Sequence, residues 1–424
     1  MQHSIHETKL KNGAQGLVVR VPGVDVVRIL VEFRAGYDLG DWAKFELPHV
    51  MEHMMFTNKS YPEPGQFSKE VEKNGAFNNA YTSSTSLEYD YECAAFEVER
   101  IARLVGIQIS EPTFPSDEFS NEVGNVIEEL NGNLSSPMHS ASYNLSIAQE
   151  GLPQIQDRIA QIDSMSTDDL KRWYQHTHTG ANMRFIVAGD VDFEDKVLPH
   201  IDVDLPQGDR LEVPSMASES LEHPIVESRD IPQIYYVVRS NIASTYSYRE
   251  MLAARVASNI LSAGFTSTLL GKAREKGLVY GLGMGIDRDM NETGWGFRGM
   301  VTPKHAEEYF DLAAEEISKV IKGDVTPEQF QATKQLMRGN RALNYQKTSN
   351  FVNYYESFFT LGYNDFEDFD RIVDELTIEE VTSCFSRLFE SSKPGMSFLG
   401  AVDEAQATEY SRQLQSIWGI SSTS

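Results

Sequence analysis

The chain has 424 residues, of which 41% are hydrophobic and 24% are charged, and this composition is typical of a folded protein with more than one domain. Its 63 acidic and 37 basic residues give a formal net charge of −26, which disfavours nucleic acid as a partner because phosphate binding needs basic surface. We find no run of about 18 apolar residues and no signal-like N-terminus, so we expect no membrane span and a cytoplasmic protein.

The first half of the chain predicts strands separated by helices. Residues 26–33 are apolar and β-branched, which favours a strand. Pro48 stands where a helix could begin, since the first turn tolerates its missing N–H. A second helix should begin before Phe119, where acidic residues precede an apolar stripe. Another strand follows over residues 184–192, and the polar, proline-containing stretch beyond it favours a linker over residues 211–228.

The second half repeats the first at a constant offset. The matched positions, each 211 residues apart, are Phe119 and Phe330, Ser166 and Thr377, and Gly189 and Gly400. Strand-like residues 233–238 also correspond to residues 26–33. We therefore predict two homologous domains, residues 1–210 and 229–424, joined by the linker. The order of strands and helices predicts an α+β fold in which each domain has a mostly antiparallel sheet with helices on one face.

Three polar side chains on one predicted helix favour a metal site. His49 and His53 are four residues apart, so both imidazoles lie on one face about a turn apart, and neutral imidazole suits zinc. Glu52 lies beside them, where its carboxylate can take a proton from an attacking water without ligating the metal. With only 10 histidines in the chain, a chance match is on the order of a few per cent.

A catalytic zinc site usually has three protein ligands, and the helix near Phe119 offers a candidate for the third. Glu122 and Glu129 are two turns apart and flank its apolar stripe, where a carboxylate is costly unless it is paired or metal-bound. We predict Glu129 as the third ligand and Glu122 as the residue that orients a ligand imidazole. Glu128 points about 100° away and should face solvent.

The internal repeat provides a control for this assignment. At the offset of 211, Glu122 and Glu129 correspond to Thr333 and Asn340, and the second half has no His-x-x-x-His. We therefore expect one Zn²⁺ per chain, held in the N-terminal domain.

These residues resemble the pitrilysin or insulinase family of zinc metallopeptidases, the half-length type that includes the mitochondrial processing peptidase subunits. The resemblance runs from about Val26 to Asp403 and rests on the inverted motif His49-Val50-Met51-Glu52-His53 and on the helix from Glu122 to Glu129. It implies that Glu52 is the catalytic base, that Glu129 is the third zinc ligand, and that Glu122 supports a ligand.

The resemblance also implies residues that bind substrate. Asn79, Ala80 and Thr82 are similar to the family's Asn-Ala-x-Thr strand, whose edge pairs with a peptide backbone. Leu87 stands where the family usually has Thr. Arg274 and Tyr280 look like the family's Arg…Tyr pair, which contacts substrate, and Tyr280 is expected to support catalysis.

The expected function is hydrolysis of short or unfolded peptides by a zinc endopeptidase. The family's architecture implies a chamber built from two such chains, so a homodimer or a heterodimer with a related subunit is expected. The alternatives are a non-catalytic structural or regulatory subunit of the same fold that pairs with an active partner, and a metal-binding module without hydrolysis.

Overall fold

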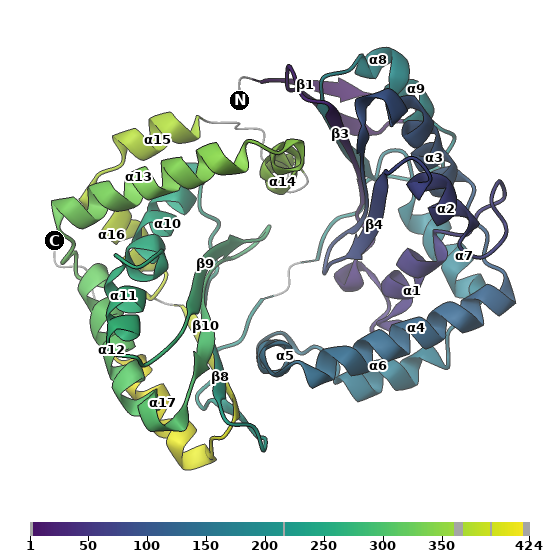
Figure 1. Cartoon of the computed structure of the whole chain (residues 1–424). Helices are drawn as coiled ribbons and strands as arrows, with labels where there is room; N and C mark the ends of the chain where they lie inside the picture. Colours follow the sequence, from purple (N-terminus) through teal and green to yellow (C-terminus); the bar gives the residue numbers. More distant parts are fainter. Residues whose placement is uncertain (1–2, 215–216, 360–367, 391, 419–424) are drawn as a thin grey trace. The chain divides into compact units, whose positions relative to one another are not determined.

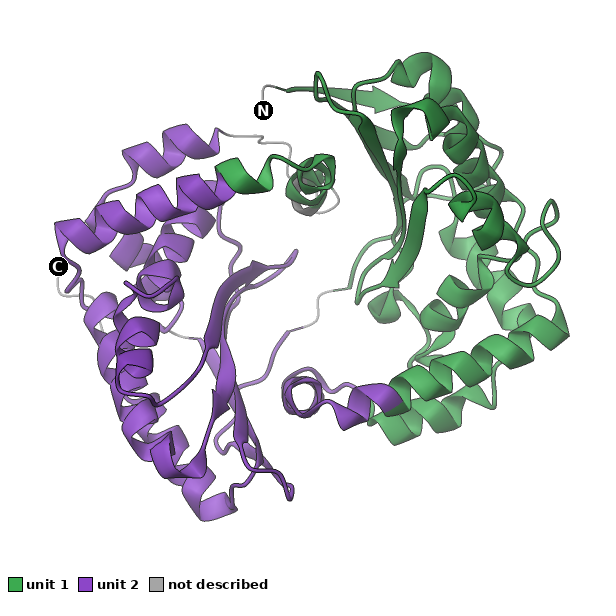
Figure 2. Ribbon diagram, viewed as in Figure 1, with its two compact units in different colours: residues 1–131, 153–214, 342–366 green, residues 132–152, 215–341, 367–424 purple. Residues whose placement is uncertain are grey.

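Two β-sheets organise the computed structural model, which describes residues 3–214, 217–359, 368–390 and 392–418 (Figure 1). The chain forms two compact units, coloured separately in Figure 2. Unit 1 consists of residues 1–131, 153–214 and 342–366, and unit 2 consists of residues 132–152, 215–341 and 367–424.

Unit 1 is built on a six-stranded sheet with the order β1-β2-β6-β3-β5-β4. Only β2 and β6 run parallel, and every other neighbouring pair in this sheet is antiparallel. The strands are β1 (Ser4–Lys9), β2 (Gln15–Arg20), β3 (Val26–Phe33), β4 (Phe77–Thr82), β5 (Leu87–Ala94) and β6 (Met183–Gly189). β4 therefore lies at one edge of the sheet, and no described strand pairs with its outer side.

The helices of unit 1 lie mainly beside the core formed by β3, β5 and β6. They are α1 (Leu47–Met54), α2 (Gln66–Glu72), α3 (Val98–Ser110), α4 (Ser116–Ser135), α6 (Ile155–Ile162), α7 (Thr167–Thr177), α8 (Phe193–Lys196), α9 (Leu198–Ile201) and α14 (Thr348–Phe359), with short 3₁₀ turns η1 (Tyr37–Leu39), η2 (Trp42–Lys44) and η3 (Ala95–Glu97). In α3 the fully buried Ile101, Val105 and Ile109 recur at a helical period, so one face of the helix is apolar and packs inward.

Unit 2 repeats this plan with a five-stranded sheet of order β7-β11-β8-β10-β9. Its strands are β7 (Ile225–Ser228), β8 (Ile234–Ile242), β9 (Leu282–Arg288), β10 (Thr293–Val301) and β11 (Lys393–Gly400), and its helices are α5 (Pro137–Glu150), α10 (Tyr248–Ser262), α11 (Thr268–Glu275), α12 (Pro303–Ile321), α13 (Pro327–Asn344), α15 (Phe369–Glu375), α16 (Ile378–Arg387) and α17 (Glu404–Gln415). β7 and β11 are parallel and the remaining pairs are antiparallel, as in β2-β6-β3-β5-β4. The predicted α+β class with two largely antiparallel sheets is confirmed.

The repeat predicted at an offset of 211 residues has matching local structure. Ser166 and Thr377 both cap a helix through a capping box. Gly189 and Gly400 both have positive φ, at 154° and 124°, and they are the last residues of β6 and β11. A side chain at Gly400 would place its Cβ 2.0 Å from the carbonyl oxygen of Gln233, so glycine is required there.

One helix from each half of the sequence packs on the sheet whose strands come from the other half. α5 contacts β7, β8 and β11 in unit 2, and α14 contacts β2, β3 and β6 in unit 1. Both lie on the sheet face opposite the main helical layer: Leu145 of α5 packs with Val237 and Leu399, whereas Tyr236 and Val238 point into the larger core. We still propose that the two sequence copies are residues 1–210 and 229–424, joined by a linker at 211–228. The compact units differ from these copies because α5 and α14 each pack on the sheet of the other copy.

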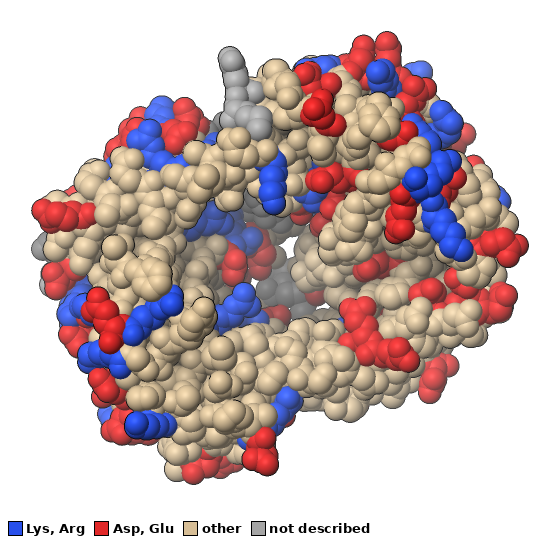
Figure 3. All heavy atoms as spheres, in the orientation of Figure 1, with Lys and Arg blue, Asp and Glu red and all other residues tan. Residues whose placement is uncertain are grey.

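Acidic and basic side chains both lie on the surface of the protein. On the face drawn in Figure 3, Asp and Glu side chains are interspersed with Lys and Arg. Cys93 and Cys384 are buried free thiols. Within the described ranges, no helix combines the length and the apolar character needed to cross a bilayer.

Candidate metal centre

The centre is built on α1, which begins as predicted at Pro48 in its first turn. His49 and His53 lie on one face of this helix, with ring centroids 5.0 Å apart. The opposite side of the helix is anchored by Val50, Met51 and Met54, all fully buried. Because that apolar side is fixed in the core, the two imidazoles are held facing α4.

Glu129 of α4 meets both imidazoles. Its Oε2 lies 3.4 Å from Nε2 of His49 and 3.8 Å from Nε2 of His53. One ligand atom from each of the three residues lies within 4.8 Å of the other two. The predicted ligands therefore converge on a space the size of a single cation, and among the described residues no other group of His, Cys, Asp and Glu side chains does so.

Two further carboxylates set the orientation of the imidazole rings. Nδ1 of His53 lies 2.9 Å from Oε2 of Glu122, and Nδ1 of His49 lies 2.9 Å from Oε2 of Glu46. When each Nδ1–H donates to its carboxylate, both Nε2 lone pairs point toward Glu129. This donor set, with two imidazole nitrogens, one carboxylate and carboxylates behind both rings, fits zinc.

Glu46 is a member of the site that the sequence analysis missed. Its carboxylate is fully buried and also accepts a hydrogen bond from Arg158, whose guanidinium lies over the ring of Phe45. Burial would raise the pKa of Glu46, but His49 and Arg158 outweigh this and hold the pKa below its usual value. The available signal was its position three residues before His49, one helical turn away.

The hydrogen bonds between the histidines and their carboxylates also shift the pKa values of His49 and Glu122. Burial opposes the charged form of His49, yet its hydrogen bond to Glu46 raises the pKa of the imidazole overall. On the other side of the site, the hydrogen bond from His53 lowers the pKa of Glu122. Both carboxylates are thus ionised at neutral pH, as an electrostatic support for a cation requires.

Glu52 lies on α1 between the two histidines in sequence, and its Oε2 accepts a hydrogen bond of 2.6 Å from the hydroxyl of Thr82. Thr82 is the last residue of the edge strand β4, which also carries Asn79 and Ala80. The open edge of β4 and the carboxylate of Glu52 are therefore directly connected. Leu87, which stands where the family usually has Thr, is fully buried and packs in the core.

Arg274 and Tyr280 belong to unit 2, at the end of α11 and just before β9. The guanidinium of Arg274 lies 4.2 Å from the ring centroid of Phe265 and 5.0 Å from that of Tyr280. Tyr280 is 81% exposed and Phe265 is 72% exposed. The two predicted substrate-binding residues are thus in contact with each other and accessible to solvent.

Models of one peptidase family match two parts of the chain. The model described as insulinase (peptidase family M16) matches residues 47–152, which contain every residue of the candidate metal centre except Glu46 and Arg158. The model described as the peptidase M16 inactive domain matches residues 164–337. Together the two matches cover more than half of the chain, and the second begins only after the last candidate zinc ligand.

The chain is also similar to individual proteases of known sequence or structure. An uncharacterised zinc protease of Rickettsia bellii is 22% identical over 290 residues, which cover 67% of this chain and 70% of that protein. The insulin-degrading enzyme-like 2 of Arabidopsis thaliana is 25% identical over 194 residues, or 42% of this chain and 20% of that protein. The crystal structure of a protease from Helicobacter pylori matches with a TM-score of 0.83 and 18% identity, covering 94% of this chain and 100% of that one, which shows a shared fold.

Proposed function

Because the chain belongs to the insulinase family of peptidases (family M16), we propose that it is a zinc-dependent endopeptidase that hydrolyses short or unfolded peptides. The observation that carries the proposal is the convergence of His49, His53 and Glu129 within 4.8 Å, with carboxylates behind both imidazoles. The likeness to zinc proteases supports the metal.

In the proposed reaction each group has one task. His49, His53 and Glu129 hold one Zn²⁺ per chain, which when bound supplies a Lewis acid for the scissile carbonyl. Glu52 accepts a proton from the attacking water and returns it to the leaving amine. The hydrogen bond from Thr82 keeps the Glu52 carboxylate directed toward the end of β4.

The substrate is proposed to bind as an added strand along β4. Asn79 and Ala80 pair with β5 on one side, which leaves the other edge of β4 for the backbone of a peptide. Such binding recognises extended backbone, so it selects short or unfolded peptides over folded proteins.

We further propose that two chains form the working enzyme, either two copies or this chain with a related subunit. Arg274 and Tyr280 would then contact substrate at a zinc site, and their exposure leaves them free to do so. Measuring the solution mass tests the assembly, and a monomer that cleaves peptides at full rate contradicts it.

The function is tested with Glu52→Gln and chelation, read by mass spectrometry of peptide products and by elemental analysis. Glu52→Gln should retain zinc and lose cleavage by about 100-fold or more, because the amide cannot accept the proton. A chelator should abolish cleavage by the wild type, and added Zn²⁺ should restore it. Glu128→Gln is the matched control, because Glu128 is an exposed helix residue beside Glu129.

Three outcomes separate the candidates. A wild type that binds zinc but cleaves no peptide indicates a non-catalytic subunit or a metal-binding module. Cleavage that persists in Glu52→Gln refutes the mechanism, and a chain that binds no zinc refutes the site.

A further inference from the structure

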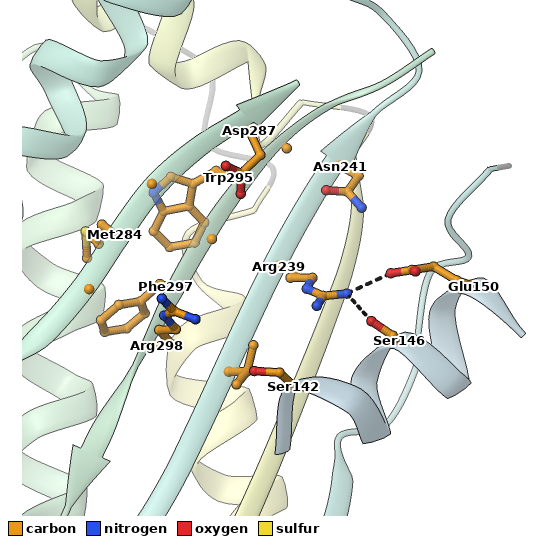
Figure 4. A pocket seen from close by; sticks show the side chains of 15 residues that line it. Ser142, Ser146, Glu150, Arg239, Asn241, Met284, Asp287, Trp295, Phe297 and Arg298 are labelled. Atoms are coloured by element: carbon orange, nitrogen blue, oxygen red, sulfur yellow. Dashed lines mark hydrogen bonds and ion pairs between the residues drawn. The ribbon is translucent and has the colours of Figure 1, made fainter. Parts of the chain in front are cut away.

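A pocket lies on the sheet of unit 2, away from the metal centre in sequence and built from other residues. It has a volume of about 510 Å³ and opens between α5 and the strands β8, β9 and β10 (Figure 4). Its polar lining comes from Ser142, Ser146 and Glu150 of α5 and from Arg239, Arg298 and Asp287 of the sheet. Trp295 and Phe297 are buried beneath it on β10.

The floor of this pocket is made of glycine. Gly285 of β9 pairs directly with Gly296 of β10, and Gly283 and Gly294 flank them on the same two strands. A Cβ built at Gly285 or Gly296 would meet no atom within 4 Å, so the fold itself does not require glycine at either position. Glycine in the interior of a strand weakens the strand and marks places where another backbone approaches closely.

Arg239 stands at the wall of the pocket in a fixed orientation. Its Nη1 donates to Oε1 of Glu150 at 2.7 Å and to the hydroxyl of Ser146 at 2.8 Å, as the dashed lines in Figure 4 show. Both contacts come from α5 and use one nitrogen. Among the described residues, the other N–H groups of this guanidinium have no acceptor, and a ligand can use them.

Arg298 supplies a second cation on the same face. Arg239 pairs with Gly296, and Arg298 is two residues along β10, so both side chains leave the sheet on the same side. In the described ranges, Arg298 has no acidic side chain, hydrogen-bond acceptor or aromatic ring as a partner, in a chain with 63 acidic residues. It is exposed, and its stem lies across Gly283.

The acidic residues of the pocket do not neutralise the part of it that lies around Arg298. Glu150 is already paired with Arg239. Asp287 is four residues along β9 from Gly283, the register partner of Arg298, which places it roughly 13 Å from that end at ~3.3 Å per residue. A carboxylate between the two arginines can therefore accept hydrogen bonds from both guanidinium groups at a position away from Asp287.

We propose that this pocket binds a carboxylate of an extended peptide (its free C-terminus or an Asp or Glu side chain) between Arg239 and Arg298, with the peptide backbone on the glycine floor. The inference rests on the proposed function, since it adds a subsite for the peptide substrate. Guanidinium groups bind carboxylates through paired, charge-assisted hydrogen bonds, which gives the site its chemical selectivity.

The test measures binding without cleavage, in the full chain carrying Glu52→Gln. The probe is a fluorescein-labelled decapeptide of Ala, Gly, Ser and Leu with one central Glu, made in four forms: Glu or Gln at the centre, each with a free or an amidated C-terminus. Fluorescence anisotropy then compares the parent with Arg298→Ala and Gly296→Val. Arg255→Ala is the matched control, because Arg255 is an exposed arginine of α10 outside the pocket.

Arg298→Ala should raise the Kd of the carboxylate-bearing forms about tenfold, and leave the amidated Gln form unchanged. Gly296→Val should weaken all four forms by filling the floor. Loss of parent affinity on amidation identifies the C-terminus as the ligand, and loss on changing Glu to Gln identifies the side chain.

Equal affinities of the parent and Arg298→Ala for every form overturn the proposal, as does an equal loss in Arg255→Ala. Cleavage of the same peptides by the wild type is measured separately. Absence of cleavage with Arg298-dependent binding refutes the proposed function alone, and cleavage with Arg298-independent binding refutes the pocket alone.

Discussion

Replacing the two supporting carboxylates one at a time separates metal binding from folding. Glu46 and Glu122 each accept a hydrogen bond from Nδ1 of a candidate ligand at 2.9 Å. Their surroundings differ, because the Glu46 side chain is fully buried and the Glu122 side chain is 21% exposed. Glutamine keeps the shape of either side chain but removes the charge.

Both variants should bind zinc about 10- to 100-fold more weakly, which corresponds to roughly 1.4–2.8 kcal/mol. Only Glu46→Gln should also destabilise the zinc-free protein, by about 3–5 kcal/mol, because it removes the negative charge that pairs with the buried guanidinium of Arg158. The side chain of Glu122 and that of its partner His53 are both partly exposed. Solvent therefore screens their interaction, and replacing Glu122 should cost less stability.

Zinc affinity is measured by competition with a chromophoric chelator, and stability by urea unfolding of the zinc-free chain. Zinc affinity unchanged in Glu46→Gln contradicts its role behind His49. A loss of stability in Glu122→Gln as large as that in Glu46→Gln contradicts the reasoning from burial.

Three further predictions concern the hydrogen bond to Glu52, the pH dependence of stability, and two glycines. Thr82→Val should lower kcat about tenfold with zinc content unchanged, because it removes the hydrogen bond to Glu52, and an unchanged kcat argues against that contact. Burial and the charge of Glu88 raise the pKa of Glu356 from 4.5 to about 8, so the stability from its protonated form is complete below about pH 4.5 and is lost as the pH rises through about 8. Glu356→Gln should therefore flatten the fall of the urea midpoint between about pH 4.5 and pH 8, and an unaltered slope in that range counts against this. Gly400→Ala should lower Tm by several degrees because of its positive φ and its contact with Gln233, whereas Gly124→Ala, with open space in a helix, should raise Tm slightly.

The sequence alone was sufficient where the decisive contacts are local. Spacing of four residues put His49 and His53 on one helical face, and spacing of seven put Glu122 and Glu129 on another. The repeat at 211 residues was visible because capping residues such as Ser166 and Thr377 act within one turn of their own helix. The α+β class followed from the order of such elements.

Other features depended on contacts between distant segments. Arg158 binds Glu46, which lies 112 residues away in the sequence, and no spacing pattern in the sequence predicts that pair. The exchange of α5 and α14 could not be predicted either, because the spacing of apolar residues along a helix does not say which sheet the helix packs on. The pocket of unit 2 required the register of β8, β9 and β10 to bring Arg239, Arg298 and the glycines to one face.

One physical reason explains why some features could be predicted from the sequence and others could not. A helical or extended backbone determines which neighbouring side chains share a face, and this can be read from spacing. Which faces then meet is decided by the burial of apolar surface over the whole chain, and many pairings satisfy the same local pattern. Only the tertiary structure therefore paired Arg158 with Glu46 and, among the described residues, left Arg298 without a carboxylate partner.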